Sequence, residues 1–258
     1  MTQTFARLIA ALSLAALLAP GAARAEFGTT NLQLLQGWSF EKDANGTTDK
    51  KLTTLTINHF STWSHGDNFF FADLARGKLN GSDTVTSGVY AEWHPRLFLN
   101  KLGLPTGGVV KNWGLAGEVN QGGSFFAYLG GLGLDLAIPG FQVAGLNVFY
   151  RYDTLDLGTY RAYNSTYQVS PFWDVPFKIG PTSWDFSGFL DLTTNDGRLD
   201  IMSQPELLLD VGAFAGAPGK LHVGVEWYLH YFKTPTGSET VSAPQLMIQW
   251  TPFTQFVP

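Results

Sequence analysis

The chain has no cysteine and few charged residues, and both shortages limit what it can be. Without cysteine, neither disulfides nor thiolate chemistry is available. Charged residues make up 14 % of the sequence, whereas soluble domains carry roughly 25 %. Beyond the first 25 residues, no apolar run approaches the roughly 20 residues that a membrane-spanning helix needs. Few windows show helical periodicity, so the pattern favours a chain built from strands.

Aromatic residues and glycine are abundant instead. The sequence is 45 % hydrophobic and 14 % aromatic, and it contains 29 glycines. In a secreted chain this composition is typical of the Gram-negative outer membrane, although a soluble lectin-like sandwich can share it. The net charge of −5 argues against nucleic-acid binding, which needs a basic surface.

The first 25 residues have the layout of a secretory signal peptide. One positive charge at Arg7 precedes the apolar run Leu8–Leu18, and Ala23-Arg24-Ala25 forms a small-x-small cleavage site. The apolar run is too short for a membrane anchor. We therefore predict a cleaved signal peptide at residues 1–25, followed by a single domain at 26–258.

The stretch Phe141–Asp153 shows the repeating unit of that domain. Apolar and polar side chains alternate along it, so they fall on opposite faces of a strand. Pro139-Gly140 just before it cannot continue a ladder and marks a turn. We expect the apolar face on lipid and the polar face in a barrel lumen. The lipid set is Leu146, Val148 and Tyr150, and the lumen set is Asn147, Phe149 and Arg151.

Twelve such runs, separated by Gly, Pro, Asn or Asp turns, cover the mature chain. A sheet with a fully apolar face needs a partner layer, and lipid can be that layer if the sheet closes and leaves no unpaired edge. The sequence therefore predicts an all-β fold, a transmembrane antiparallel β-barrel of about 12 strands. The runs are Thr29–Phe40, Leu52–Thr62, Asn68–Leu74, Val85–Arg96, Lys111–Asn120, Ser124–Leu136, Phe141–Asp153, Ala162–Pro171, Trp184–Leu192, Ser203–Ala213, Leu221–Phe232 and Pro244–Phe253.

One predicted strand carries four polar or aromatic groups on a single face: Tyr90, Glu92, His94 and Arg96. Such a ladder is too costly in hydrocarbon and must face the lumen. Two interpretations stay open. Glu92 and Arg96 can be structural ion pairs that fill the lumen, or they can contact a passing solute.

Three phenylalanines, Phe69, Phe71 and Phe149, also fall on the inward face. Aromatic rings stack with a nucleobase for roughly 1–3 kcal/mol, whatever the base. A register shift by one residue would instead place Phe70 inward and move Phe69 and Phe71 to the lipid girdle.

The remaining polar residues do not form a recognisable reaction centre. His222, Glu226 and His230 share a face, but residues four apart on a strand lie about 13 Å apart, which is too far for one metal ion. No Gly-x-Ser-x-Gly elbow is present, so the expectation is a protein that is not an enzyme and needs no cofactor or metal. A hydrolase with a triad assembled from distant strands stays an alternative. Further inward carboxylates give a cation-friendly interior: Asp185, Asp191, Glu206 and Asp210.

Several segments in order resemble the nucleoside-specific channel-forming (Tsx-like) outer-membrane family. They are TLTINHFSTWSHGDNFFFADLARG (Thr54–Gly77), YAEWHPRLFLNKL (Tyr90–Leu102), VKNW (Val110–Trp113) and LGLDLAIPGFQVAGLNVFYRYD (Leu132–Asp153). The similarity continues more weakly through Tyr163–Asp191. Two departures are the C-terminal end, QLMIQWTPFTQFVP, which lacks a plain alternating strand closing on an aromatic residue, and the poor match of the loops and the last three strands.

This resemblance implies a monomeric, 12-stranded outer-membrane channel that passes nucleosides down their gradient. It also implies that phage or colicins can use the barrel as a receptor. The lumen role carries over most directly to Phe69, Phe71, Asp73, Glu92 and Arg96. Alternatives are a channel for other small solutes, an outer-membrane hydrolase, and a non-conducting receptor or structural barrel.

Overall fold

The computed structural model describes residues 26–40, 51–79, 84–122, 126–153, 156–157, 160–161, 166–195 and 198–256. The predicted signal peptide lies outside these ranges and stays a prediction. No helix in the described part of the chain is long and apolar enough to cross a membrane.

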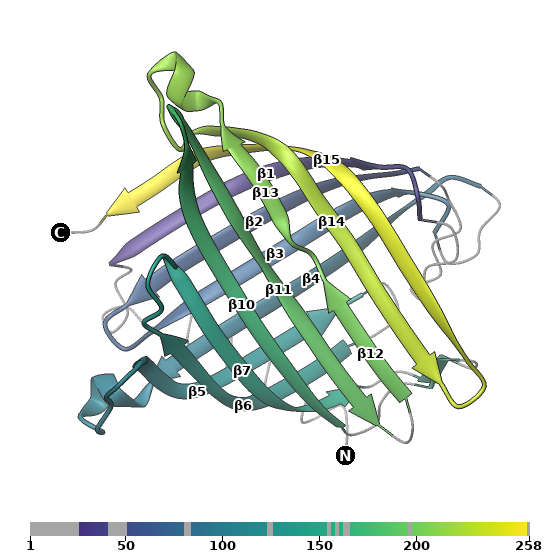
Figure 1. Cartoon of the computed structure of the whole chain (residues 1–258). Helices are drawn as coiled ribbons and strands as arrows, with labels where there is room; N and C mark the ends of the chain where they lie inside the picture. The colour runs from purple at the N-terminus through teal and green to yellow at the C-terminus, as the bar shows by residue number, and fades with distance from the viewer. Residues whose placement is uncertain are drawn as a thin grey trace.

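The chain folds into one closed antiparallel sheet, whose strands are tilted and wrap around a central lumen (Figure 1). The first strand pairs with the last, which closes the sheet. β12 and β13 both pair with β11 and β14, so they are two halves of one barrel strand, and the 13 strands of the sheet fill 12 positions. The predicted β-barrel is confirmed. The strands are β1 (Phe27–Gly37), β2 (Leu52–Trp63), β3 (Gly66–Gly77), β4 (Thr86–Phe98), β5 (Val110–Gln121), β6 (Phe126–Leu136), β7 (Val143–Asp153), β10 (Thr166–Ile179), β11 (Thr182–Asn195), β12 (Arg198–Ser203), β13 (Glu206–Asp210), β14 (Leu221–Thr234) and β15 (Gly237–Phe256).

Short elements join some of the strands. A 3₁₀ turn, Leu99–Leu102, follows β4, and another, Gly212–Ala215, follows β13. The two-residue strands β8 (Asp156–Leu157) and β9 (Tyr160–Arg161) pair with each other between β7 and β10. The turn predicted at Pro139-Gly140 is present, and Gly140 has a φ of 87°, which a residue with a Cβ rarely adopts.

The two faces of the barrel wall differ as the alternation predicts. On β7, Val148 and Tyr150 are exposed on the outside, whereas Asn147 and Phe149 are buried inside. Exposed aromatics lie near both ends of the outer face, with Tyr152 and Tyr167 towards one end and Trp250 and Phe253 towards the other. A closed sheet with an apolar outer face and aromatics at both rims is built to span a lipid bilayer.

Two predicted strand boundaries are wrong because a proline marks neither the end of β10 nor the start of β15. β10 continues to Ile179, past Pro171 and Pro176. Pro171 lies in a gap of the β10–β11 ladder, between the pairs formed by Val169 and Phe172. Pro176 lies beyond the last β7–β10 pair, so the ladder needs no N–H from it. β15 likewise starts well before Pro244.

Two further boundaries differ from prediction. The run Ser203–Ala213 is broken after Ser203 and ends at Asp210, because the chain enters the 3₁₀ turn. β1 ends at Gly37, and Phe40 turns back to bury its ring against Tyr228, with 5.3 Å between ring centroids. Phe40 therefore lies beyond the strand, although the predicted run extends to it.

Candidate functional site

Phe69 and Phe71 lie side by side on the inner face of β3. Their ring centroids are 6.0 Å apart, and the neighbouring Phe70 is exposed on the opposite face. Each ring also contacts β4, with Phe69 5.5 Å from the ring of His94 and Phe71 5.9 Å from that of Tyr90. The structure thus has the predicted arrangement, with Phe69 and Phe71 facing inward and Phe70 facing outward.

Carboxylates adjoin this aromatic pair. In the β3–β4 ladder, Phe71 is opposite Glu92 and Asp73 is opposite Tyr90. The Tyr90 hydroxyl donates to Glu92 Oε1, and Thr56 Oγ1 donates to Asp73 Oδ1 at 2.6 Å. The lumen therefore presents two apolar ring faces next to two hydrogen-bond acceptors.

His94 lies between two glutamates. Its Nε2 is 2.8 Å from Glu92 Oε2, and its Nδ1 is 3.4 Å from Glu118 Oε2. Glu118 comes from β5 and is 3 % exposed, whereas the His94 side chain is 20 % exposed. The sequence gives no signal for Glu118, because its position opposite His94 depends on the β4–β5 register.

Arg96 forms the most extensive ion-pair cluster. It contacts both carboxylate oxygens of Asp67 on β3, with Nε to Oδ1 at 2.8 Å, and its Nη1 is 2.7 Å from Asp135 Oδ1 on β6. The guanidinium also lies 5.1 Å from the ring of Phe98 and 5.0 Å from that of Phe172. Arg96 does not pair with Glu92 on its own strand. The structural ion-pair interpretation fits Arg96, with partners supplied by other strands.

The lumen residues predicted on β7 all face inward. Arg151 Nε is 2.9 Å from Asp153 Oδ1, and its Nη1 donates to Gln168 Oε1 at 2.7 Å. Phe149 packs in a cluster with Ala116, Ala127 and Leu129 and is 1 % exposed. A ring so fully covered cannot stack with a solute, so the stacking role expected for Phe149 is wrong. Asn147 is also buried.

The opposite side of the lumen carries carboxylates with neutral partners. Gln33 Nε2 donates to Glu206 Oε1 at 3.4 Å, and Glu226 Oε1 accepts from Gln245 Nε2 at 2.8 Å. Asp174 lies next to Asp185 and Glu206. We call Asp174, Asp185, Asp191, Glu206 and Glu226 the acidic wall.

Asp210, which the sequence analysis grouped with the inward carboxylates, has a structural role. Its two oxygens accept hydrogen bonds from the backbone N–H groups of Ala213 and Gly219, at 3.0 and 2.8 Å. It therefore closes the turn between β13 and β14 and does not belong to the acidic wall.

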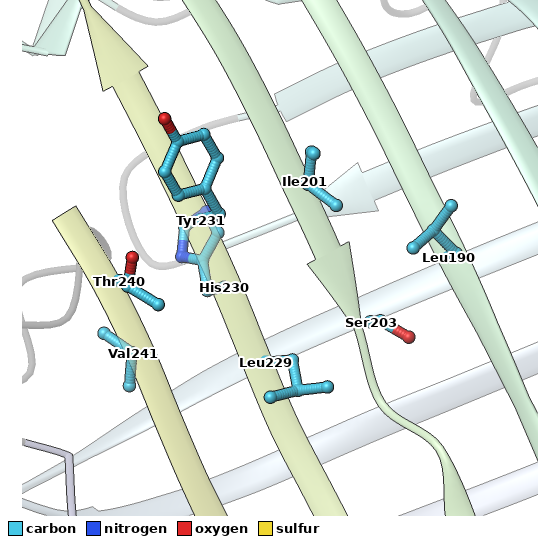
Figure 2. A pocket seen from close by; sticks show the side chains of 8 residues that line it. All are labelled: Leu190, Ile201, Ser203, Leu229, His230, Tyr231, Thr240 and Val241. Carbon is cyan, nitrogen blue, oxygen red and sulfur yellow. The ribbon is translucent and has the colours of Figure 1, made fainter. Parts of the chain in front are cut away.

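A hollow of about 290 Å³ lies where β12 gives way to β13 (Figure 2). Four side chains around it, those of Leu190, Ile201, Leu229 and Tyr231, alternate with inward residues such as His230 and Asp191 and therefore belong to the outer face. Most of the hollow thus faces the lipid side of the wall, and the buried His230 and Val241 form its inner edge.

Serine–histidine contacts do not build a hydrolytic site in the described ranges. Ser64 Oγ is 2.7 Å from His65 Nδ1 in the turn between β2 and β3. No carboxylate in the described residues lies within ion-pair distance of His65, so the third member of a triad is missing there.

No protein-family model matches the chain, and no curated protein matches it either. Among solved structures the chain is similar to the KdgM porin, with a TM-score of 0.46 and 9 % identity over 86 % of this chain and 98 % of that one. It is also similar to a bacterial polysaccharide outer membrane secretin, with a TM-score of 0.42 and 9 % identity over 88 % and 99 % of the two chains. The translocator domain of the autotransporter NalP from Neisseria meningitidis gives a TM-score of 0.31 and 10 % identity over 96 % and 95 %. These are likenesses between barrels at low identity, and the resemblance to nucleoside channels stays a prediction.

Proposed function

We propose that this barrel is an outer-membrane channel through which nucleosides or similar small solutes diffuse passively. The observation that carries the proposal is the inward aromatic pair, Phe69 and Phe71, placed directly beside Asp73 and Glu92. A nucleoside combines a flat apolar base with a ribose that donates hydrogen bonds. Rings would hold the base, and carboxylates would accept from the hydroxyls.

Several weak contacts in series suit a channel better than one tight site. Conduction requires binding that is favourable enough to admit a solute and weak enough to release it. The half-exposed rings of Phe69 and Phe71 offer such contacts, because stacking contributes about 1–3 kcal/mol per base. The ion pairs of Arg96 and Arg151 would hold the wall around them in place.

A second candidate is a channel for small organic cations. The acidic wall motivates it, because it gathers five carboxyl groups on one side of the lumen, where Glu206 and Glu226 have neutral amide partners. On either assignment, the same wall would slow anionic solutes.

Current block by adenosine in planar bilayers tests the nucleoside assignment. Phe71→Ala removes one stacking face and should weaken block about 5- to 150-fold, which corresponds to about 1–3 kcal/mol. Phe70→Ala is the matched control, because it removes the same ring from the lipid side of the same strand and should leave block unchanged.

The proposal would be contradicted if adenosine did not block the wild-type current. It would also be contradicted if Phe71→Ala and Phe70→Ala changed the block equally, including the case in which neither changed it. Block by an organic cation such as choline, in place of adenosine, would favour the second candidate.

A further inference from the structure

The proposed solute contacts use Glu92 but leave its neighbours His94 and Glu118 unexplained. The ligand atoms of Glu92, His94 and Glu118 all lie within 4.8 Å of one another. His94 and Glu118 meet where Pro95 interrupts the β4–β5 ladder, between the pairs Trp93–Val119 and Arg96–Ala116. The two side chains therefore face each other across adjacent strands at a fixed register.

The two ring nitrogens of His94 have different surroundings. A neutral imidazole that donates from Nε2 to Glu92, at 2.8 Å, presents the lone pair of Nδ1 to Glu118 Oε2. With Nδ1 unprotonated, two acceptors face each other at 3.4 Å, and either a second proton on the ring or a metal ion between them would remove the repulsion. The separation is long for a hydrogen bond, as is that from Gln33 to Glu206. It matches the spacing of two ligands held about 2.1 Å from one tetrahedral zinc ion, which is about 3.4 Å.

Buried oxygens beside this gap have no partner. Glu118 Oε1 and Asn120 Oδ1 lack hydrogen-bond partners within the described part of the chain, and both residues are 3 % exposed. Asn120 is the register partner of Glu92 and shares the inner face of β5 with Glu118. Eight buried side-chain atoms of the described residues lack a partner, and these two are adjacent and beside the gap, so a metal ion with its water would satisfy both at once.

We propose that His94 and Glu118 bind a divalent transition-metal ion such as Zn²⁺ in the lumen. His94 Nδ1 and a Glu118 oxygen are the protein ligands, and Glu92 orients the imidazole by accepting from Nε2. A carboxylate that accepts the free ring N–H is the usual companion of a histidine bound to zinc. Asn120 Oδ1 accepts a hydrogen bond from a water on the metal or binds the metal itself. The partly exposed side chains of His94 and Glu92 give access from the lumen.

Zinc titration of the folded barrel in detergent, after dialysis against a chelator, tests this site by calorimetry. Wild type should bind one Zn²⁺ per chain. His94→Gln and Glu118→Gln should each lower the affinity at least tenfold, and Glu92→Gln should lower it about 10- to 100-fold. Asp200→Asn is the matched control, because it removes the carboxylate 2.8 Å from the other paired lumen histidine, His230, and should leave the affinity within twofold.

A second measurement needs no variant. Zinc added to ¹⁵N-labelled wild type should shift the Nδ1 resonance of one histidine and leave its Nε2 protonated. No heat from wild type, or equal binding by wild type and the three variants, would overturn the proposal. If wild type gives no heat, a second proton on the His94 ring, and not a metal ion, lies between Nδ1 and Glu118. No solute is present in either experiment, so failure here leaves the nucleoside proposal untouched.

Discussion

The two sides of the lumen satisfy their charged groups in different ways. On β3 to β7, carboxylates meet Arg96, Arg151 or His94, and we call these ion-paired residues the paired wall; Asp73, which accepts from the Thr56 hydroxyl, is not among them. On β10 to β14, Glu206 and Glu226 of the acidic wall accept from glutamine amides and Asp191 from the Ser170 hydroxyl, although Asp200 on β12 still pairs with His230. Burying an ion pair makes each partner depend on the other, whereas a neutral partner leaves the charge free to act on a solute. We therefore expect the paired wall to contribute more to stability, and the acidic wall to contribute more to any preference for charge.

Arg96→Met is the largest test of this comparison. It leaves Asp67 and Asp135 buried without their cation, and breaking a buried pair in this way costs about 3–5 kcal/mol. Urea unfolding in lipid vesicles, followed by tryptophan fluorescence, should show that loss. Arg76→Met is the control, because Arg76 is exposed on the same barrel's β3, and the change should stay within about 0.5 kcal/mol. If the two variants were equally stable, the buried ion pairs of Arg96 would contribute no more to the free energy of unfolding than the exposed Arg76 does.

Phe149→Leu tests a smaller effect on the side of the lumen that carries the paired wall. Phe149 is covered by Ala116, Ala127 and Leu129, so a hydrophobic residue of similar volume should cost less than about 1.5 kcal/mol. Adenosine block should be unchanged, because no face of the ring reaches the lumen. Val148→Leu on the outer face of β7 is the control for stability. A change in block by Phe149→Leu would restore the stacking role that its burial excludes.

The face of the barrel wall that a side chain occupies could be predicted from the sequence, because it depends only on whether its position along the strand is odd or even. Alternation along Phe141–Asp153 placed Asn147, Phe149 and Arg151 inside, and the structure agrees. Parity does not report how much of an inward side chain its neighbours cover. Phe71 and Phe149 have the same parity, yet only Phe149 is sealed, because Ala127 and Leu129 on β6 close over it.

Partners between strands could not be predicted, because they depend on register and on prolines. Arg96 reaches Asp67, 29 residues away, and Asp135, 39 residues away, through three ladders. Glu118 faces His94 only because the β4–β5 register continues across Pro95. The predicted strand ends at Pro171, although gaps in the neighbouring ladders accommodate both Pro171 and Pro176 within β10. These features become visible only when the strands are paired.

The smallest expected change in stability comes from the acidic wall. Glu206→Gln together with Asp185→Asn keeps side-chain size and hydrogen-bonding ability and removes two ionisable groups. Asp174, Asp185 and Glu206 lie close together, and no basic side chain of the described residues forms an ion pair with them, so the free energy of unfolding should stay within about 0.5 kcal/mol or rise. The reversal potential across a KCl gradient should nevertheless move towards that of a non-selective pore.

Asp153→Asn is the matched change on the paired wall. It leaves Arg151 without its carboxylate and should both lower stability and weaken cation preference. If the acidic-wall variant lost as much stability as Asp153→Asn does, the two walls would not differ in their contribution to stability. If its reversal potential stayed at the wild-type value, the acidic wall would not set the charge preference of the channel.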